Sequence, residues 1–327
     1  NYFHGAGIMG DPCEVLTGRD VATGEMAGLA SRGTQRLFVN GECREVGYIG
    51  GVRICKDYEG RGLLAAGAKM VRERGNPDDL YFAVIASDNI SALKLLAGKR
   101  PPMGIHLRPL GGVRTFSLLT RRHAVKLSPG IEIRQGNKEI LAQIIAFLSE
   151  CGKHQQFFPC VSAEDLTGGV RFRGLALEDI YLAYRQGQLA GVLANWDQSA
   201  FKQDIVARYS PALRTFGGVY NLFAKVIGRQ PLPNIGAAIP LNFGALGCVG
   251  DNDPELFKAL LQTCINAAAM KHKGYFLLSM HESDPLLLVV QRFMHIGYRS
   301  ELFAYSWSAE TLAALDDRLP YIEAATL

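Results

Sequence analysis

The most informative stretch of the sequence is Val52-Arg-Ile-Cys-Lys-Asp-Tyr-Glu-Gly-Arg-Gly-Leu-Leu-Ala-Ala66, which runs from an extended segment through a glycine-rich turn into a helix. Apolar residues after the turn recur with helical spacing, which predicts a helix that begins just beyond Gly62 and ends before Gly75. A helix N-terminus carries exposed amides and partial positive charge, and Gly60 has, like Gly62, no side chain to block a ligand. The turn is therefore a candidate cradle for an anion such as a phosphate.

The strand before this turn, residues 42–55, is expected to be antiparallel to its predecessor. Residues 14–17 and 26–38 are apolar-rich segments, and Asn40-Gly41 is the strongest short hairpin signal in the chain. A dinucleotide fingerprint requires a parallel β-α-β unit and three glycines, and a P-loop requires Gly-Lys followed by Ser or Thr. The stretch contains neither pattern, so both nucleotide-binding interpretations are rejected.

The first half then continues as strand, helix and strand. Residues 80–86 form a short buried strand, and Asp88-Asn89 caps the helix that follows it. Residues 105–120 are expected to form a strand pair around Gly111-Gly112. A Ser-Pro-Gly linker comes next and places a boundary between two domains, 1–124 and 125–327.

The second half repeats this element order. Its expected elements are a strand at 131–134, a helix at 138–153, a hairpin of 180–184 and 189–197, a glycine-rich strand region at 235–249, a helix at 254–273, a strand at 275–280, a helix at 285–294 and a strand at 298–307. Two halves with one element order predict a structural duplication. The predicted fold class is α/β, of the α+β kind, in which each domain is a mixed, mostly antiparallel sheet flanked by helices.

The composition is that of a globular chain. Of 327 residues, 48% are hydrophobic and 20% are charged, which excludes a disordered, collagen-like or coiled-coil protein. A net charge of +4 gives little reason to expect a nucleic-acid partner, and no apolar run approaches the ~20 residues of a membrane span. Seven scattered cysteines without a Cys-x-x-Cys pair encode neither a disulfide framework nor a zinc knuckle, which favours a reducing, cytoplasmic setting.

These features together resemble the GNAT superfamily of acyl-CoA-dependent N-acyltransferases. The resemblance covers most of residues 14–120 and is carried by the hairpin, the strand ending Val52-Arg53-Ile54, the turn Glu59-Gly-Arg-Gly-Leu-Leu64 and the segment Asn89-Ile-Ser-Ala-Leu-Lys-Leu-Leu96. In that family the turn follows a Gln/Arg-x-x-Gly-x-Gly/Ala pattern. Gly62 matches the central glycine, whereas Glu59 replaces the basic or amide residue and Leu64 replaces the small one.

The resemblance implies an acyl-CoA site in the first domain. Its implied contacts are the turn residues Gly60, Arg61, Gly62, Leu63 and Leu64 for the CoA pyrophosphate, the backbone of Val52, Arg53 and Ile54 for the pantetheine arm, and Asn89 near the pantetheine end. The implied acyl donor is acetyl-CoA, and no metal is expected.

The resemblance implies different roles for the two halves of the chain. A GNAT domain usually opens with a strand and one or two helices, yet almost nothing precedes Glu14, so N-terminal residues of the native protein are expected to be missing. The second half resembles a complete domain, but its turn reads Gly250-Asp-Asn-Asp-Pro254, with Asp253 as helix cap and Pro254 in the first helical position. These polar side chains would repel a pyrophosphate. We therefore expect CoA in the first copy only, with a degenerate second copy that shapes the acceptor pocket or a dimer.

Acyl transfer to an amine needs a base for the ammonium group and a proton for the leaving thiolate. Family members with a glutamate base place it about fourteen residues before the central glycine, where this chain has Tyr48. Strand alternation puts Tyr48 on one face with Val52 and Ile54, and its phenol is a proton donor, an orienter of water or a wall of the site. The tyrosine acid of many relatives is replaced by Leu96, which moves no proton.

Three other groups have competing structural interpretations. His281-Glu282-x-Asp284 lacks the second histidine of a zincin motif and is expected to be a polar turn between strand and helix. Cys55 is expected to be an inert, buried thiol. Trp196-Asp197-Gln198 is expected to pack under a loop and receives no functional role.

Two main function classes stay open at this point. The first is an N-acetyltransferase that moves an acetyl group from acetyl-CoA to a small-molecule or peptide amine by direct attack. The second is a regulatory module that binds acyl-CoA without turnover, which Leu96, Glu59 and the lack of an identifiable base favour. A transferase of aminoacyl or long acyl chains is a third possibility. No membrane partner is expected, and the protein is expected to be a monomer or a homodimer.

Overall fold

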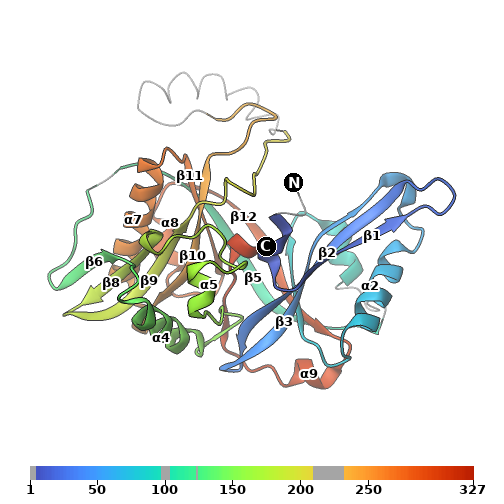
Figure 1. The fold of residues 1–327 in the computed structure, drawn as a ribbon, viewed down its shortest axis with the longest axis horizontal. Coiled ribbons are helices and arrows are strands. Elements are labelled where there is room, and N and C mark those ends of the chain that lie inside the picture. The colour runs from blue at the N-terminus through green and yellow to red at the C-terminus, as the bar shows by residue number, and fades with distance from the viewer. Residues whose placement is uncertain (1–4, 97–103, 123, 209–231) are drawn as a thin grey trace.

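The computed structural model describes residues 5–96, 104–122, 124–208 and 232–327, and most of its strands form one continuous mixed sheet (Figure 1). The order of the 11 strands is β1-β2-β3-β4-β12-β5-β11-β10-β9-β8-β6, and β7 and β13 form a separate pair. The strands are β1 (Cys13–Arg19), β2 (Met26–Val39), β3 (Glu42–Ile54), β4 (Tyr81–Ala86), β5 (His106–Leu119), β6 (Ile131–Gln135), β7 (Gln155–Gln156), β8 (Ile180–Arg185), β9 (Gln188–Trp196), β10 (Leu241–Val249), β11 (Tyr275–His281), β12 (His295–Ser306) and β13 (Leu319–Pro320). The helices include α2 (Leu63–Arg74), α3 (Ile90–Leu96), α4 (Leu141–Gly152), α5 (Ala163–Thr167), α7 (Pro254–Met270), α8 (Leu287–Gln291) and α9 (Ala309–Ala313).

The first half opens with the antiparallel meander that the sequence predicts. β1, β2 and β3 pair in order, and Asn40 and Gly41 turn the chain between β2 and β3 with φ of 53° and 83°. Both values lie in the left-handed region that an Asn-Gly hairpin turn requires. The register of β2 and β3 shifts between Gly50 and Arg53, which marks a bulge in β3. The bulge interrupts the alternation of side chains just before the turn into α2.

Within the 11-stranded sheet, each half contains one pair of parallel strands that separate after a short contact. β3 pairs with β4 only at Gly47 and Tyr48, and β10 pairs with β11 only at residues 241–243. Beyond these contacts β4 pairs with β12 and β11 pairs with β5, while β3 and β10 run on into the turns before α2 and α7. We call the opening between β3 and β4 the first divergence, and the opening between β10 and β11 the second divergence.

The two halves exchange their closing strands. β12 lies between β4 and β5, and β5 in turn lies between β12 and β11. The prediction of a strand pair over residues 105–120 is therefore wrong, because β5 is one long strand. Gly111 and Gly112 allow side chains of the second half to pack closely against β5. A Cβ at Gly111 would collide with His281, and one at Gly112 would collide with Glu282.

Helices cover both faces of the second half, whereas the first half is covered more thinly. α4 packs in one buried cluster with Trp196, and α7 packs in another with Phe276. α2 buries only Val71, so the apolar face that the sequence predicts for this helix is largely exposed, and Met70 is 41% exposed. Within the described ranges, no helix is both long enough and apolar enough to cross a membrane.

The C-terminal segment, residues 315–327, lies between the two halves (Figure 1). Leu315 and Ile322 belong to the buried cluster that holds Tyr48 of the first half, and Ala325 belongs to the cluster of α4 in the second half. The segment is therefore part of the contact between the halves. The domain boundary near residue 124 stays a prediction, because strand exchange joins the two halves into one sheet.

A disulfide joins Cys43, at the start of β3, to Cys160. The cysteine pattern, which encodes no disulfide framework, gives no indication of this single bond. Backbone pairing against β2 brings the two cysteines together, since the amide of Cys160 donates to the carbonyl of Arg36 and the amide of Phe38 donates to that of Phe158. The separation of 117 residues hides this pairing from any spacing pattern. The scattered cysteines therefore no longer support a cytoplasmic setting, which stays a prediction.

Candidate functional site

The turn into α2 leaves the N-terminus of this helix open. Gly60 and Gly62 have φ of 74° and 80°, and Gly62 is the cap residue of α2. No side-chain hydrogen bond caps α2, and its first turn contains no acidic residue. A Cβ at either glycine would meet no atom within 4 Å. Residues 60–64, predicted to hold a pyrophosphate, therefore present the positive end of the helix dipole to open space.

The strand that leads into this turn is also accessible. Beyond Tyr48, no described strand pairs with the edge of β3 that faces β4. Val52 is 41% exposed, Arg53 is exposed and Ile54 is half-buried. A ligand in the first divergence has access to backbone groups of residues 52–54, in the way that an added strand pairs with a sheet edge.

α3 begins at the same end of the first divergence as α2, because each helix follows the carboxyl end of a parallel strand. Asn89 caps α3, and its Oδ1 accepts a hydrogen bond from the amide of Ala92 at 3.2 Å, as the sequence predicts. Leu64 and Ile90, in the first turns of α2 and α3, are 38% and 53% exposed. The first divergence thus combines exposed apolar side chains with an electropositive helix end, which suits a ligand with an apolar arm and an anionic group.

Tyr48, the predicted catalytic residue, is a packed side chain. It is 7% exposed and stacks on Phe82 of β4, with ring centroids 4.9 Å apart. Tyr48 and Val52 differ in burial although alternation predicts a shared face, because the bulge between them changes the alternation of β3. This packing matches the interpretation of Tyr48 as a wall. Leu96, in the position of the expected acid, packs against the cluster of Tyr81.

The corresponding turn of the second half is closed by its own side chains. The Oδ1 of Asp253 accepts hydrogen bonds from the amides of Glu255 and Leu256 at the start of α7, at 2.9 and 3.2 Å. The cap and the proline at N1 that the sequence predicts are both present. Arg185 pairs with Asp253 at 2.6 Å. These helix amides are therefore occupied, and a carboxylate stands where a phosphate would bind.

β10 contains a bulge whose amides are also occupied. The register shifts between Ala245 and Cys248, and Leu246 has a φ of 56°. The amide of Leu246 donates to Oε2 of Glu323 at 2.8 Å, and the amide of Gly247 donates to the hydroxyl of Tyr321 at 3.1 Å. The Tyr321 hydroxyl donates to Glu323 at 2.9 Å. Burial raises the pKa of Glu323 to about 7, against the lowering effect of these hydrogen bonds.

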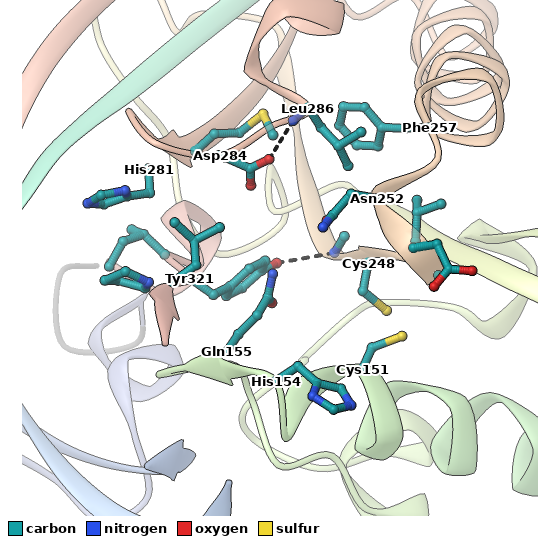
Figure 2. A pocket seen from close by; sticks show the side chains of 18 of the residues that line it. Cys151, His154, Gln155, Cys248, Asn252, Phe257, His281, Asp284, Leu286 and Tyr321 are labelled. Carbon is teal, nitrogen blue, oxygen red and sulfur yellow. Dashed lines mark hydrogen bonds between the residues drawn. The ribbon is translucent and has the colours of Figure 1, made fainter. Parts of the chain in front are cut away.

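A cavity of about 560 Å³ occupies the second divergence (Figure 2). Its walls are the C-terminal end of α4 with residues 154–155, the ends of β10 and β11 with the turns after them, and residues 319–322. Figure 2 shows the sulfurs of Cys151 and Cys248 facing each other across one wall. A hydrogen bond from Cys248 lowers the pKa of Cys151, and burial raises that of Cys248. The sequence carries no local signal for this cavity, because its walls come from four segments far apart in the chain.

The environments of Cys55 and His281 can be compared with what the sequence predicts for them. Cys55 is exposed, so the expectation of a buried thiol is wrong; β3 ends at Ile54 and leaves Cys55 outside the sheet. His281 is the buried last residue of β11, just before the polar turn that the sequence predicts, and its Nε2 lies 2.8 Å from the carbonyl of Leu110. In the described part of the chain, no cluster of three or more His, Cys, Asp or Glu side chains is arranged to hold a metal ion.

Comparison with solved structures identifies the fold. A GCN5-related N-acetyltransferase from Sphaerobacter thermophilus matches 93% of this chain and 81% of its own length with a TM-score of 0.51 at 13% identity. N-myristoyltransferase from Saccharomyces cerevisiae, with bound myristoyl-CoA, matches 93% of this chain and 72% of its own length with a TM-score of 0.53 at 12% identity. A GCN5-related glucosamine N-acetyltransferase region of a fungal multi-domain β-N-acetylglucosaminidase matches 92% of this chain with a TM-score of 0.58 at 12% identity, and this chain spans only 34% of that protein. No family model and no curated protein matches the sequence. The chain has the GNAT fold, as its sequence predicts.

Proposed function

We propose that this protein is an acyl-CoA-dependent N-acyltransferase that binds its acyl donor in the first divergence. The observation that carries the proposal is the open N-terminus of α2, where Gly60 and Gly62 leave empty space over a helix end without a side-chain cap. A diphosphate gains from such a helix dipole, and the unpaired edge of β3 runs directly into it. The fold is shared with N-acetyl- and N-myristoyltransferases, which supports the reaction class.

The proposed contacts follow from this placement. The turn residues Gly60, Arg61, Gly62, Leu63 and Leu64 hold the pyrophosphate, the backbone of Val52, Arg53 and Ile54 holds the pantetheine arm, and Asn89 orders the start of α3 beside it. Acetyl-CoA is the donor we propose, with a small-molecule or peptide amine as acceptor. Tyr48 forms the wall at the closed end of the first divergence, where its ring stacks on Phe82. Direct attack of the amine on the thioester releases CoA as a thiol.

A module that binds acyl-CoA without turnover is the second candidate. It is favoured by Leu96 in the place of a tyrosine acid and by the burial of Tyr48 against Phe82. Both candidates bind CoA, and only the transferase releases CoA thiol when an amine is present. A thiol-release assay with acetyl-CoA and a set of amines therefore separates the two.

The site is tested by isothermal titration of acetyl-CoA into the wild-type protein and into Gly62→Glu. The added carboxylate lies at the helix end and repels the pyrophosphate, so affinity falls at least 10-fold. Gly187→Glu is the matched control, because Gly187 has the same φ of 80° and open space for a Cβ but lies in the hairpin between β8 and β9. Equal binding by all three proteins, or no binding by the folded wild type, would refute the assignment.

A further inference from the structure

The wall of the cavity in the second divergence contains two thiols that face each other (Figure 2). Cys151 lies in the last turn of α4, and Cys248 lies near the end of β10. Both cysteines are free, and the Cys248 thiol donates a hydrogen bond to the sulfur of Cys151. A hydrogen-bonded pair of thiols on two neighbouring elements becomes a disulfide after only a small movement of those elements.

The two thiols differ in their access to solvent. Cys151 is half-buried, and its neighbours in the cavity wall, Glu150 and His154, have side chains that are 68% and 77% exposed. Cys248 is only 6% exposed. A small reagent that enters the cavity from solvent therefore reaches Cys151 first, and Cys248 lies behind it.

The hydrogen bond between the thiols also makes their reactivity different. It lowers the pKa of Cys151, while burial and the carboxylates of Glu150 and Asp251 act in the opposite direction. Burial raises the pKa of Cys248, so this thiol keeps its proton. A thiolate is the form of cysteine that attacks an oxidant, and a second thiol beside it resolves the oxidised product. The pair thus combines an attacking cysteine with a resolving one.

Cys264 provides a contrast in the same half of the protein. Its side chain is fully buried in α7, and its thiol donates to the carbonyl of Leu193 at 3.6 Å. Burial raises its pKa well above the usual value, and it is not among the described residues of the cavity wall. A cysteine that serves packing alone is expected to resemble Cys264, because buried structural thiols are inert.

We propose that Cys151 and Cys248 form a peroxide-sensitive dithiol, whose oxidation to a disulfide fastens the end of α4 to β10 at the wall of the cavity. This assignment does not depend on the proposed acyltransferase function. The Cys151 thiolate attacks one oxygen of hydrogen peroxide, the oxygen–oxygen bond breaks, and the leaving oxygen takes up the proton that the thiol lost. The Cys248 sulfur then bonds to the sulfur of the resulting sulfenic acid, and its proton leaves with the sulfenic oxygen as water. Two electrons pass from the thiols to the peroxide.

Oxidation is tested by treating the wild-type protein with hydrogen peroxide and mapping its cysteine peptides by mass spectrometry over time. A peptide pair that links Cys151 to Cys248 is expected, and dithiothreitol is expected to separate it again. Cys55 is the internal control, because it is free and more exposed than Cys151. Cys151 is expected to react about 10-fold faster than Cys55 or more. Absence of the linked pair, or reaction of Cys151 no faster than that of Cys55, would overturn the proposal.

The order of the two steps is tested with single variants and dimedone, which traps sulfenic acids. Cys248→Ser is expected to accumulate a trapped sulfenic acid at Cys151, because the resolving thiol is gone. Cys151→Ser is expected to leave Cys248 unlabelled. Labelling of Cys248 in Cys151→Ser, or none at Cys151 in Cys248→Ser, would contradict the assigned roles.

The fastening of α4 is tested by amide hydrogen exchange of untreated and peroxide-treated protein. Treatment is expected to slow exchange about 10-fold or more in the last turns of α4, around residues 148–152, and to leave α2 in the first half unchanged. Cys151→Ser is the matched control, and its exchange is expected to be the same with and without peroxide. A linked pair with unchanged exchange in α4 would overturn the fastening.

Discussion

The buried carboxyl of Glu323 makes the stability of this protein depend on pH in a direction opposite to that of a paired surface carboxylate. Its pKa is raised from 4.5 to about 7, mainly by burial. Between these two values the native state binds a proton that the unfolded chain does not bind, so the free energy of unfolding falls as pH rises. Each pH unit between the two pKa values corresponds to about 1.4 kcal/mol, so the loss amounts to about 3 kcal/mol between pH 4.5 and pH 8.

Glu323→Gln isolates this effect from the titration of other groups. The amide of Gln retains an acceptor for Leu246 and carries no charge at any pH. Arg171, with a pKa lowered to about 10 by burial, and Tyr321, whose pKa burial raises well above its usual value, both keep their charge state across this window. Glu323 is therefore the group of this cluster that titrates near neutrality.

The assay is urea unfolding of both proteins at intervals between pH 4.5 and pH 8.5. The difference in unfolding free energy, variant minus wild type, is expected to increase by about 3 kcal/mol over the full window from pH 4.5 to pH 8. Much of that increase falls between pH 5 and pH 7. A difference that stays constant with pH, or that decreases as pH rises, would refute the raised pKa and the burial that causes it.

Three further predictions concern the framework of the site. Gly47→Ala is expected to lower the urea midpoint by the equivalent of about 1–3 kcal/mol, because its Cβ would overlap the ring of Tyr81 at the start of the first divergence. Trp196→Ala is expected to cost about 3–5 kcal/mol in the same assay, since this indole is fully buried. Reduction of the disulfide between Cys43 and Cys160 is expected to destabilise the protein by up to about 4–5 kcal/mol, because it opens a loop of 117 residues; unfolding with and without reductant measures this.

Local signals predicted the local parts of the fold. Asn40 and Gly41 specify their hairpin through φ values that few other residue pairs adopt, and Asp253 specifies the start of α7 through hydrogen bonds to amides within three residues. The open turn at Gly60 and Gly62 was predicted for the same reason, because a helix end without a cap is visible in the residues that precede it. Each of these features is decided within about one turn of the chain.

Features that depend on distant residues were not predicted. β12 pairs with β4 and β5, which precede it by about two hundred residues. The residues of β12 contain no signal that identifies these two strands as its partners. Gly111 and Gly112 carry a turn signal, yet their role is set by His281 and Glu282, which pack over them from the second half. The cavity likewise depends on segments that only the exchanged sheet brings together.

The sheet has two similar openings, and the side chains at each helix end determine which ligand charge that opening favours. In the first divergence Gly62 leaves a helix N-terminus uncapped, so hydrogen-bond donors and positive potential are offered to a ligand. In the second, Asp253 takes the helix amides, while Tyr321 and Glu323 take the amides of the bulge. These backbone donors of the second opening are therefore occupied by side-chain oxygens. The helix end of the first opening is therefore free to receive an anion, whereas the corresponding helix end of the second opening already holds the carboxylate of Asp253.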